Sequence, residues 1–137
     1  TFVIPVHPNP NVHDKIHTKL DGFKNIHLLE PLDYPYLVYL MKNAKLILTD
    51  SGGIQEEAPS FACPTLVMRY ETERKEGIEA GVSKLVGADF DKIIKESEKI
   101  LSLSKADTRL KVQNPYGDGK SSIRIESVIK SYFLKNQ

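Results

Sequence analysis

The chain has 137 residues, 40% of them hydrophobic, and its 19 Lys and Arg residues nearly balance its 18 Asp and Glu residues. This length predicts a single domain that buries roughly 65–70% of its unfolded surface. The balanced charge argues against disorder and against strong attraction to nucleic acid or an anionic membrane. The single cysteine, Cys63, excludes an intrachain disulfide, and no apolar run approaches the roughly 18–20 residues that span a bilayer. We therefore expect a soluble, cytoplasmic domain that binds neither nucleic acid nor membrane.

Short apolar runs and helical patterns alternate along the chain. The apolar runs predict about five strands, at 2–6, 26–29, 46–48, 65–68 and 84–86. Apolar residues at helical spacing predict helices that contain residues 12–20, 34–41, 54–58, 90–101 and 125–133. Strands separated by helices are typical of a parallel sheet with right-handed crossovers, so the predicted fold is an α/β, Rossmann-like, doubly wound domain. The chain starts within an expected strand and without Met, so we expect it to be part of a longer protein.

The strongest local pattern follows the strand expected at 46–48, because ligands of such sheets lie beyond the carboxyl ends of the strands. Ser51, Gly52 and Gly53 lead there directly into a helix. Glycines let a ligand approach the backbone, and the free N–H groups and positive dipole end of a helix suit a pyrophosphate. The Ser51 hydroxyl can cap the helix or donate to a phosphate, whereas Glu57 suits a ribose diol. An ordinary strand–turn–helix junction explains this spacing equally well.

Polar residues also follow two other expected strands. His7 ends the first strand and precedes a stiff, proline-rich loop, where an imidazole could donate to a phosphate or a sugar hydroxyl, although an ordinary loop histidine is the commoner case. A dense charged patch after residue 68 is either a solvated loop with surface ion pairs or a site where an arginine binds a ligand anion. Its position beyond a strand favours the second interpretation; the patch comprises Arg69, Glu71, Glu73, Arg74, Lys75 and Glu76.

Two other kinds of site are excluded by spacing. The histidines at 13, 17 and 27 have no metal-ligand spacing with Cys63 or with paired carboxylates, so we expect no metal site. The Gly-Lys-Ser at 119–121 is part of a P-loop pattern, but a Walker A motif needs glycine where this chain has Asn114, and an apolar strand does not precede it. Residues 114–117 instead predict a turn that leads into the last helix.

Several stretches of the chain, taken together and in order, resemble the C-terminal domain of the non-hydrolysing UDP-N-acetylglucosamine 2-epimerases, which have the two-domain GT-B architecture of glycosyltransferases. The matching stretches are 6–12, 48–60, 67–69 with 72–74, and 114–119. The resemblance implies that residues 1–137 are the UDP-binding half of such a protein and that the N-terminal domain lies outside this chain. Lys75 stands where the family usually has Pro, which changes the expected conformation of that loop.

The same resemblance implies roles for single residues. Ser51, Gly52 and Gly53 would hold the diphosphate, and Glu57 would bind the ribose hydroxyls. The backbone near Leu37 would contact the uracil edge. The remaining residues would line the cleft between the two domains, with His7 near the substrate or a second, regulatory nucleotide-sugar; they are His7, Arg69, Glu73 and Arg74.

The chemistry implied by the resemblance is elimination of UDP to give a 2-acetamidoglucal, followed by re-addition after a proton returns to the other face of C2. This reaction interconverts UDP-GlcNAc and UDP-ManNAc and requires a general acid and a general base. In the family these carboxylates come from the N-terminal domain, so we name no catalytic residue here and expect no cofactor. We expect the full-length protein to be a homodimeric isomerase of polysaccharide biosynthesis and this chain alone to be inactive.

Two other functions stay open at this point. The donor-binding domain of a GT-B glycosyltransferase would share the fold and the diphosphate site, and transfer of sugar to an acceptor would identify it. A non-catalytic nucleotide-sugar sensor would lack the carboxylates of an N-terminal half. Within the epimerase interpretation, a related diacetamido-sugar is an alternative substrate.

Overall fold

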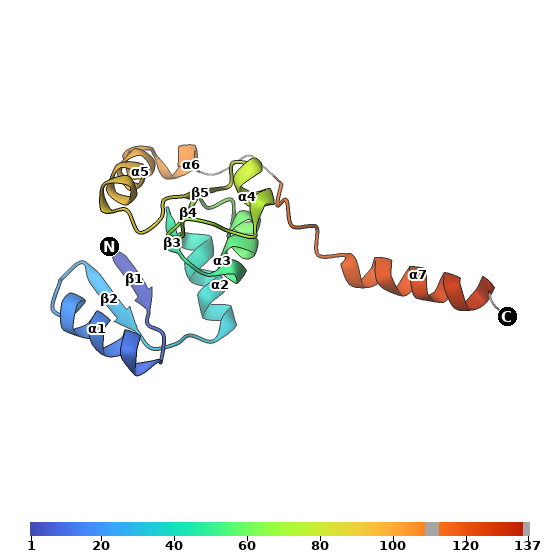
Figure 1. Ribbon diagram of the computed structural model, residues 1–137, viewed down its shortest axis with the longest axis horizontal. Helices are drawn as coiled ribbons and strands as arrows, with labels where there is room; N and C mark the ends of the chain where they lie inside the picture. The colour runs from blue at the N-terminus through green and yellow to red at the C-terminus, as the bar shows by residue number, and fades with distance from the viewer. Residues whose placement is uncertain (109–112, 136–137) are drawn as a thin grey trace. The chain divides into compact units, whose positions relative to one another are not determined.

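The computed structural model describes residues 1–108 and 113–135, and the chain divides into two compact units, Thr1–Leu40 and Met41–Gln137. Each unit is described by itself (Figure 1). In the first unit, strand β1 (Phe2–Pro5) is followed by helix α1 (Pro10–Leu20) and strand β2 (Ile26–Leu29). Helix α2 (Tyr34–Asn43) begins in this unit and ends in the second.

The two strands of the first unit form a parallel pair in which Phe2 lies opposite Ile26 and Pro5 opposite Leu29. Pro5 is the last residue of β1, a position where the missing N–H costs no interior ladder bond. Helix α1 begins at Pro10, and the Asn9 side chain caps it by accepting from the amide of Asn11 at 3.0 Å. The βαβ unit expected at this end of the chain is thus present.

The second unit has three parallel strands in the order β3-β4-β5. Strand β3 (Ile47–Thr49) pairs with β4 (Thr65–Val67), which pairs with β5 (Ser83–Leu85). The helices of this unit are α3 (Gly52–Glu57), the 3-10 helix η1 (Ala58–Phe61), α4 (Lys75–Glu79), α5 (Phe90–Ser102), α6 (Lys105–Thr108) and α7 (Ser121–Lys135). All residues of the central strand β4 are buried, as an apolar strand in the middle of a parallel sheet requires.

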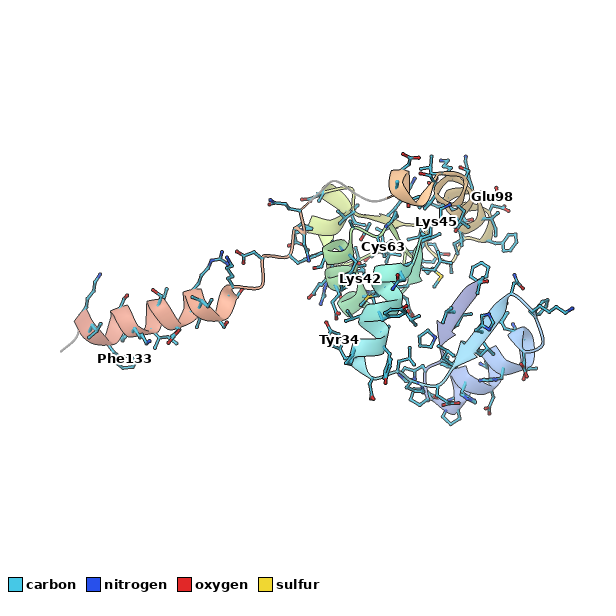
Figure 2. The ribbon with its side chains drawn as sticks, turned by 180° about the vertical axis from the view of Figure 1, so that it is seen from behind. Tyr34, Lys42, Lys45, Cys63, Glu98 and Phe133 are labelled. Carbon is cyan, nitrogen blue, oxygen red and sulfur yellow. The ribbon has the colours of Figure 1, made fainter. Side chains whose placement is uncertain are left out.

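The hydrophobic core lies mainly in the second unit. Its buried residues include Ala58, Cys63, Leu66, Val67, Val82 and Val86, whereas Val6 is the buried hydrophobic residue of the first unit. The thiol of Cys63 contacts the carbonyl oxygen of Ala44 at 3.5 Å, and Lys45 donates to the carbonyl of Leu101 at 2.8 Å near the end of α5 (Figure 2). A cation at a helix C-terminus stabilises the exposed carbonyl groups there.

The structure confirms the expected α/β fold with parallel strands, and each strand lies within about one residue of its sequence-predicted position. Hydrogen bonds join the strands as one pair and one three-stranded sheet, in different units. Helices α4 and α6 were not expected, because neither short segment has an apolar period. None of the described helices is long and apolar enough to cross a membrane.

Candidate functional site

The turn between β3 and α3 is fixed by its own polar groups. The amide of Ser51 donates to the hydroxyl of Thr49 at 3.1 Å, and the Ser51 hydroxyl accepts from the amide of Ile54 at 3.5 Å, which makes Ser51 the N-cap of α3. Within residues 1–108 and 113–135, no protein acceptor contacts the amides of Gly52 and Gly53. These two N–H groups are therefore available to an anion.

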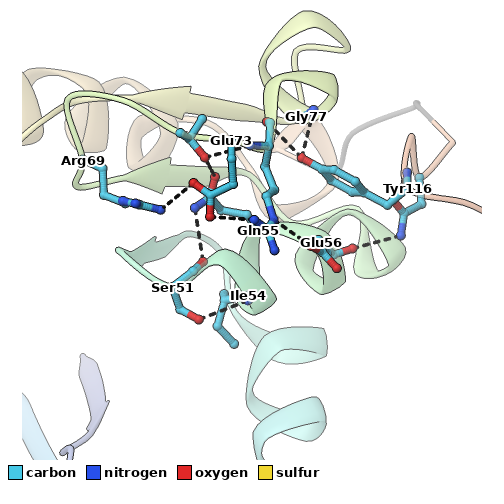
Figure 3. Close-up of polar contacts among 11 residues, drawn as sticks. Ser51, Ile54, Gln55, Glu56, Arg69, Glu73, Gly77 and Tyr116 are labelled. Atoms are coloured by element: carbon cyan, nitrogen blue, oxygen red, sulfur yellow. Dashed lines mark hydrogen bonds and ion pairs between the residues drawn. The ribbon is translucent and has the colours of Figure 1, made fainter.

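A buried glutamine connects this turn to the charged loop that follows β4. Gln55 is fully buried, and its amide nitrogen donates to the carbonyl oxygen of Ser51 at 3.3 Å. Its amide oxygen accepts from the hydroxyl of Thr72 at 2.8 Å (Figure 3). The same hydroxyl accepts from the backbone amide of Arg74 at 3.1 Å. Both polar ends of the buried amide are thus satisfied, as burial requires.

The charged loop forms an ion-pair cluster around Arg74. The Arg74 guanidinium donates to Glu56 Oε1 at 2.7 Å and to Glu73 Oε1 at 2.6 Å, and Arg69 donates to Glu73 Oε2 at 3.1 Å. The hydrogen bond to Glu56 raises the pKa of Arg74. The pKa of Glu73 is lowered, first by its own backbone amide and then by the charges of Arg69 and Arg74. Arg74 and Glu73 are therefore both charged at neutral pH.

The cluster lies directly against the glycine turn. A Cβ atom placed on Gly52 would lie 3.3 Å from Cζ of Arg74 and 3.4 Å from Oε1 of Glu73. The absence of a side chain at this position therefore brings a guanidinium close to the backbone that starts α3. An anion that accepts from the free amides of the turn would have this guanidinium beside it, in the arrangement that suits phosphate oxygens.

A segment far along the chain holds the other side of the loop. The Tyr116 hydroxyl donates to the carbonyl of Arg74 at 3.1 Å and accepts from the amide of Gly77 at 3.0 Å (Figure 3). The side-chain amide of Asn114 donates to the backbone carbonyl of Glu56 at 3.1 Å. Burial raises the pKa of Tyr116, so this hydroxyl keeps its proton at neutral pH.

The structure brings together most, but not all, of the candidate residues from the sequence. Gly52 lies beside Glu73 and Arg74, and Arg69 joins them through Glu73. Ser51 and Gly53, the other expected phosphate-binding residues, flank Gly52 in the same turn. The half-buried Glu57 is the last residue of α3. Two candidates lie in the first unit: His7, which is exposed and accepts from the amide of Asn9 at 3.1 Å, and the half-buried Leu37 in α2.

Sequence reasoning did not single out Gln55, Thr72 or Tyr116. All three lie in the stretches that carry the family resemblance, but nothing in their spacing shows which residues they contact. Among the described residues, no group of three or more His, Cys, Asp and Glu side chains could hold a metal ion.

Comparison with known proteins identifies the family of this chain. Residues 1–130 match the UDP-N-acetylglucosamine 2-epimerase family. The chain is 52% identical over 133 residues to a probable UDP-N-acetylglucosamine 2-epimerase from Ralstonia solanacearum, which covers 96% of this chain and 36% of the relative. It is 50% identical over 132 residues to the UDP-N-acetylglucosamine 2-epimerase of Salmonella typhimurium, and this alignment covers 96% of this chain and 35% of the relative.

Solved structures show the same likeness. The S. aureus MnaA–UDP complex superposes with a TM-score of 0.87 at 41% identity, over 96% of this chain and 36% of that chain. The Neisseria meningitidis UDP-GlcNAc 2-epimerase bound to UDP-GlcNAc gives a TM-score of 0.80 at 45% identity, over 95% of this chain and 36% of that chain. This chain thus spans about a third of the length of these relatives. It belongs to the UDP-N-acetylglucosamine 2-epimerase family.

Proposed function

We propose that residues 1–137 form the UDP-binding, C-terminal part of a UDP-N-acetylglucosamine 2-epimerase. The observation that carries this proposal is the Arg74 guanidinium against Gly52, beside two backbone amides that no protein acceptor contacts within the described residues. Two relatives whose structures hold UDP or UDP-GlcNAc share 41–45% of their aligned residues with this chain, which supports the same ligand here.

In this proposal the diphosphate binds at the start of α3. The amides of Gly52 and Gly53 and the hydroxyl of Ser51 donate to its oxygens, and Arg74 neutralises part of its charge. Before the ligand arrives, the glutamates hold the Arg74 guanidinium in place. When the diphosphate binds, one of its oxygens replaces a carboxylate as the partner of Arg74. Glu57 binds the ribose diol.

The other candidates have less direct roles in the proposal. Arg69 and Glu73 line the cleft beside the diphosphate, the backbone at Leu37 contacts the uracil, and His7 lies near the sugar or a second nucleotide-sugar. The ligand is a UDP-sugar that the full-length protein interconverts between UDP-GlcNAc and UDP-ManNAc without a cofactor. The general acid and base belong to an N-terminal domain outside these residues, and the full-length protein is a cytoplasmic homodimer.

The test is a titration of the chain with UDP. Calorimetry measures the affinity, and the NMR chemical shifts of the backbone amides show where the ligand binds. We expect a Kd from high micromolar to millimolar, about 4–6 kcal/mol of binding free energy, because part of the cleft is missing. The amides of Gly52 and Gly53 should shift most. Ser51→Ala and Glu57→Ala should each weaken binding by about three- to tenfold through the loss of one hydrogen bond.

A sharper variant separates binding from helix capping. Ser51→Asp keeps an N-cap of equal quality but places a carboxylate where the phosphates bind, so UDP binding should disappear while the melting temperature stays close to that of the wild type. Ser131→Ala and Glu98→Ala, both exposed positions on α7 and α5, are matched controls and should bind as the wild type does. Unmoved Gly52 and Gly53 resonances at saturating UDP would contradict the proposal.

A further inference from the structure

Gln55 places a fully buried side-chain amide beside the proposed phosphate site. A buried amide destabilises a protein unless hydrogen bonds replace its water, and an apolar side chain would fill the same space without that requirement. The two ends of Gln55 bind different segments, namely the carbonyl of Ser51 and the hydroxyl of Thr72. Its position therefore joins the glycine turn to the charged loop.

The direction of each hydrogen bond in this connection is fixed. The backbone amide of Arg74 can only donate, so the Thr72 oxygen accepts from it and the Thr72 proton points to the amide oxygen of Gln55. The amide nitrogen of Gln55 then donates to the carbonyl of Ser51. One continuous chain of donors runs from Arg74 to Ser51, and such chains strengthen each of their bonds.

This series of hydrogen bonds fixes the backbone from which the Arg74 side chain extends. The Arg74 amide is held by Thr72 and its carbonyl by Tyr116, while Cζ of the guanidinium lies 3.3 Å from the point that a Cβ on Gly52 would occupy. A guanidinium pairs with phosphate oxygens through a planar, directional fork. A small displacement of the loop would therefore misalign that fork with the amides of the turn.

We propose that Gln55 and Thr72 are positioning residues, which set Arg74 against the Gly52 turn so that one diphosphate contacts both. This inference rests on the proposed function, since it describes how the same site is assembled. Neither residue touches the ligand.

The experiment compares three side chains at position 72 in the full 137-residue chain. Thr72→Val keeps the shape but removes both hydrogen bonds of the hydroxyl, and Thr72→Ser keeps the hydroxyl. We expect Thr72→Val to weaken UDP binding by about tenfold and Thr72→Ser to bind within about twofold of the wild type. The control is Thr18→Val on α1, where the hydroxyl donates only to the carbonyl of Asp14, and UDP binding should not change.

Two more measurements distinguish positioning from general destabilisation. The amide resonance of Arg74 in the ligand-free chain should move in Thr72→Val and stay in place in Thr72→Ser. Gln55→Met removes the same connection from the other side, so the double variant with Thr72→Val should bind no more weakly than either single variant.

The outcomes separate this inference from the proposed function. If the wild type binds UDP and Ser51→Asp does not, but Thr72→Val binds normally or Thr72→Ser is as weak as Thr72→Val, the positioning role is overturned and the proposed function stands. If the wild-type chain does not bind UDP at all, both fail.

Discussion

Tyr116 connects two backbone groups that lie close together in space but about forty residues before it in sequence. Its hydroxyl contacts the carbonyl of Arg74 and the amide of Gly77, and Gly77 leaves room for it. A Cβ on Gly77 would overlap the Tyr116 hydroxyl and lie 3.3 Å from its Cζ atom. The glycine is required here by close approach of a side chain that is itself anchored.

The contact between Gly77 and Tyr116 predicts the effect of a side chain at position 77. Gly77→Ala should lower the free energy of unfolding by about 1–3 kcal/mol, the usual cost of overpacking a buried site. In a Tyr116→Phe background the same substitution should cost clearly less, because the overlapping oxygen is gone. Urea titrations of the four proteins measure this double-mutant cycle, and equal costs in both backgrounds would contradict the contact.

The sequence predicted part of the site at this scale. The Ser51-Gly52-Gly53 turn could be located because a strand, two glycines and a helix leave a local pattern. The charged residues Arg69, Glu73 and Arg74 could be located only as a patch after a strand. Gln55 could not be recognised as a buried connector, since its partner Thr72 lies 17 residues away and only folding brings the two together.

At the scale of elements, Glu96 ties helix α5 to strand β5. Its carboxylate accepts from Lys84 of β5 at 2.7 Å and from Lys99 of α5 at 3.0 Å. These hydrogen bonds, first Lys84 and then Lys99, lower the pKa of Glu96 to about 2. The connection is present only while the carboxylate is ionised.

This pKa predicts how stability depends on pH. A carboxyl group whose pKa falls on folding stabilises the fold at pH values above its unfolded-state pKa, and the contribution is lost as the pH falls toward the folded value of about 2. Glu96→Gln should therefore lower the melting temperature at pH 7 and make little difference near pH 2. Glu98→Gln, an exposed neighbour on α5, is the control. A Glu96→Gln effect that is equal at both pH values would contradict the prediction.

The element pattern was more predictable than the contacts between elements. Strands β3 and β4 are short apolar runs between polar residues, and α5 has a regular apolar period, so both kinds of element follow from local sequence. Helix α4 begins at Lys75 within the charged patch, where no apolar period predicts a helix. Gly77 of this helix contacts Tyr116, a partner that no local pattern reveals.

At the scale of the whole molecule, we predict that the chain binds UDP without turning over UDP-GlcNAc. The elimination needs an acid and a base at the sugar, and the proposal places both outside residues 1–137. Incubation with UDP-GlcNAc, followed by chromatography for UDP-ManNAc, should show no product. The parent full-length protein, assayed in parallel, should form it. Product from the 137-residue chain would show that it carries its own acid and base.

The contacts of Asn114 and Tyr116 also set how far the second unit can be shortened without loosening the charged loop. Truncation after α5 or α6 would retain every strand but release Arg74 and the end of α3 from their distant partners. A fragment that keeps both contacts therefore has to extend at least through Tyr116. Helix α7, whose described side chains are all exposed, is the part that such trimming can remove first.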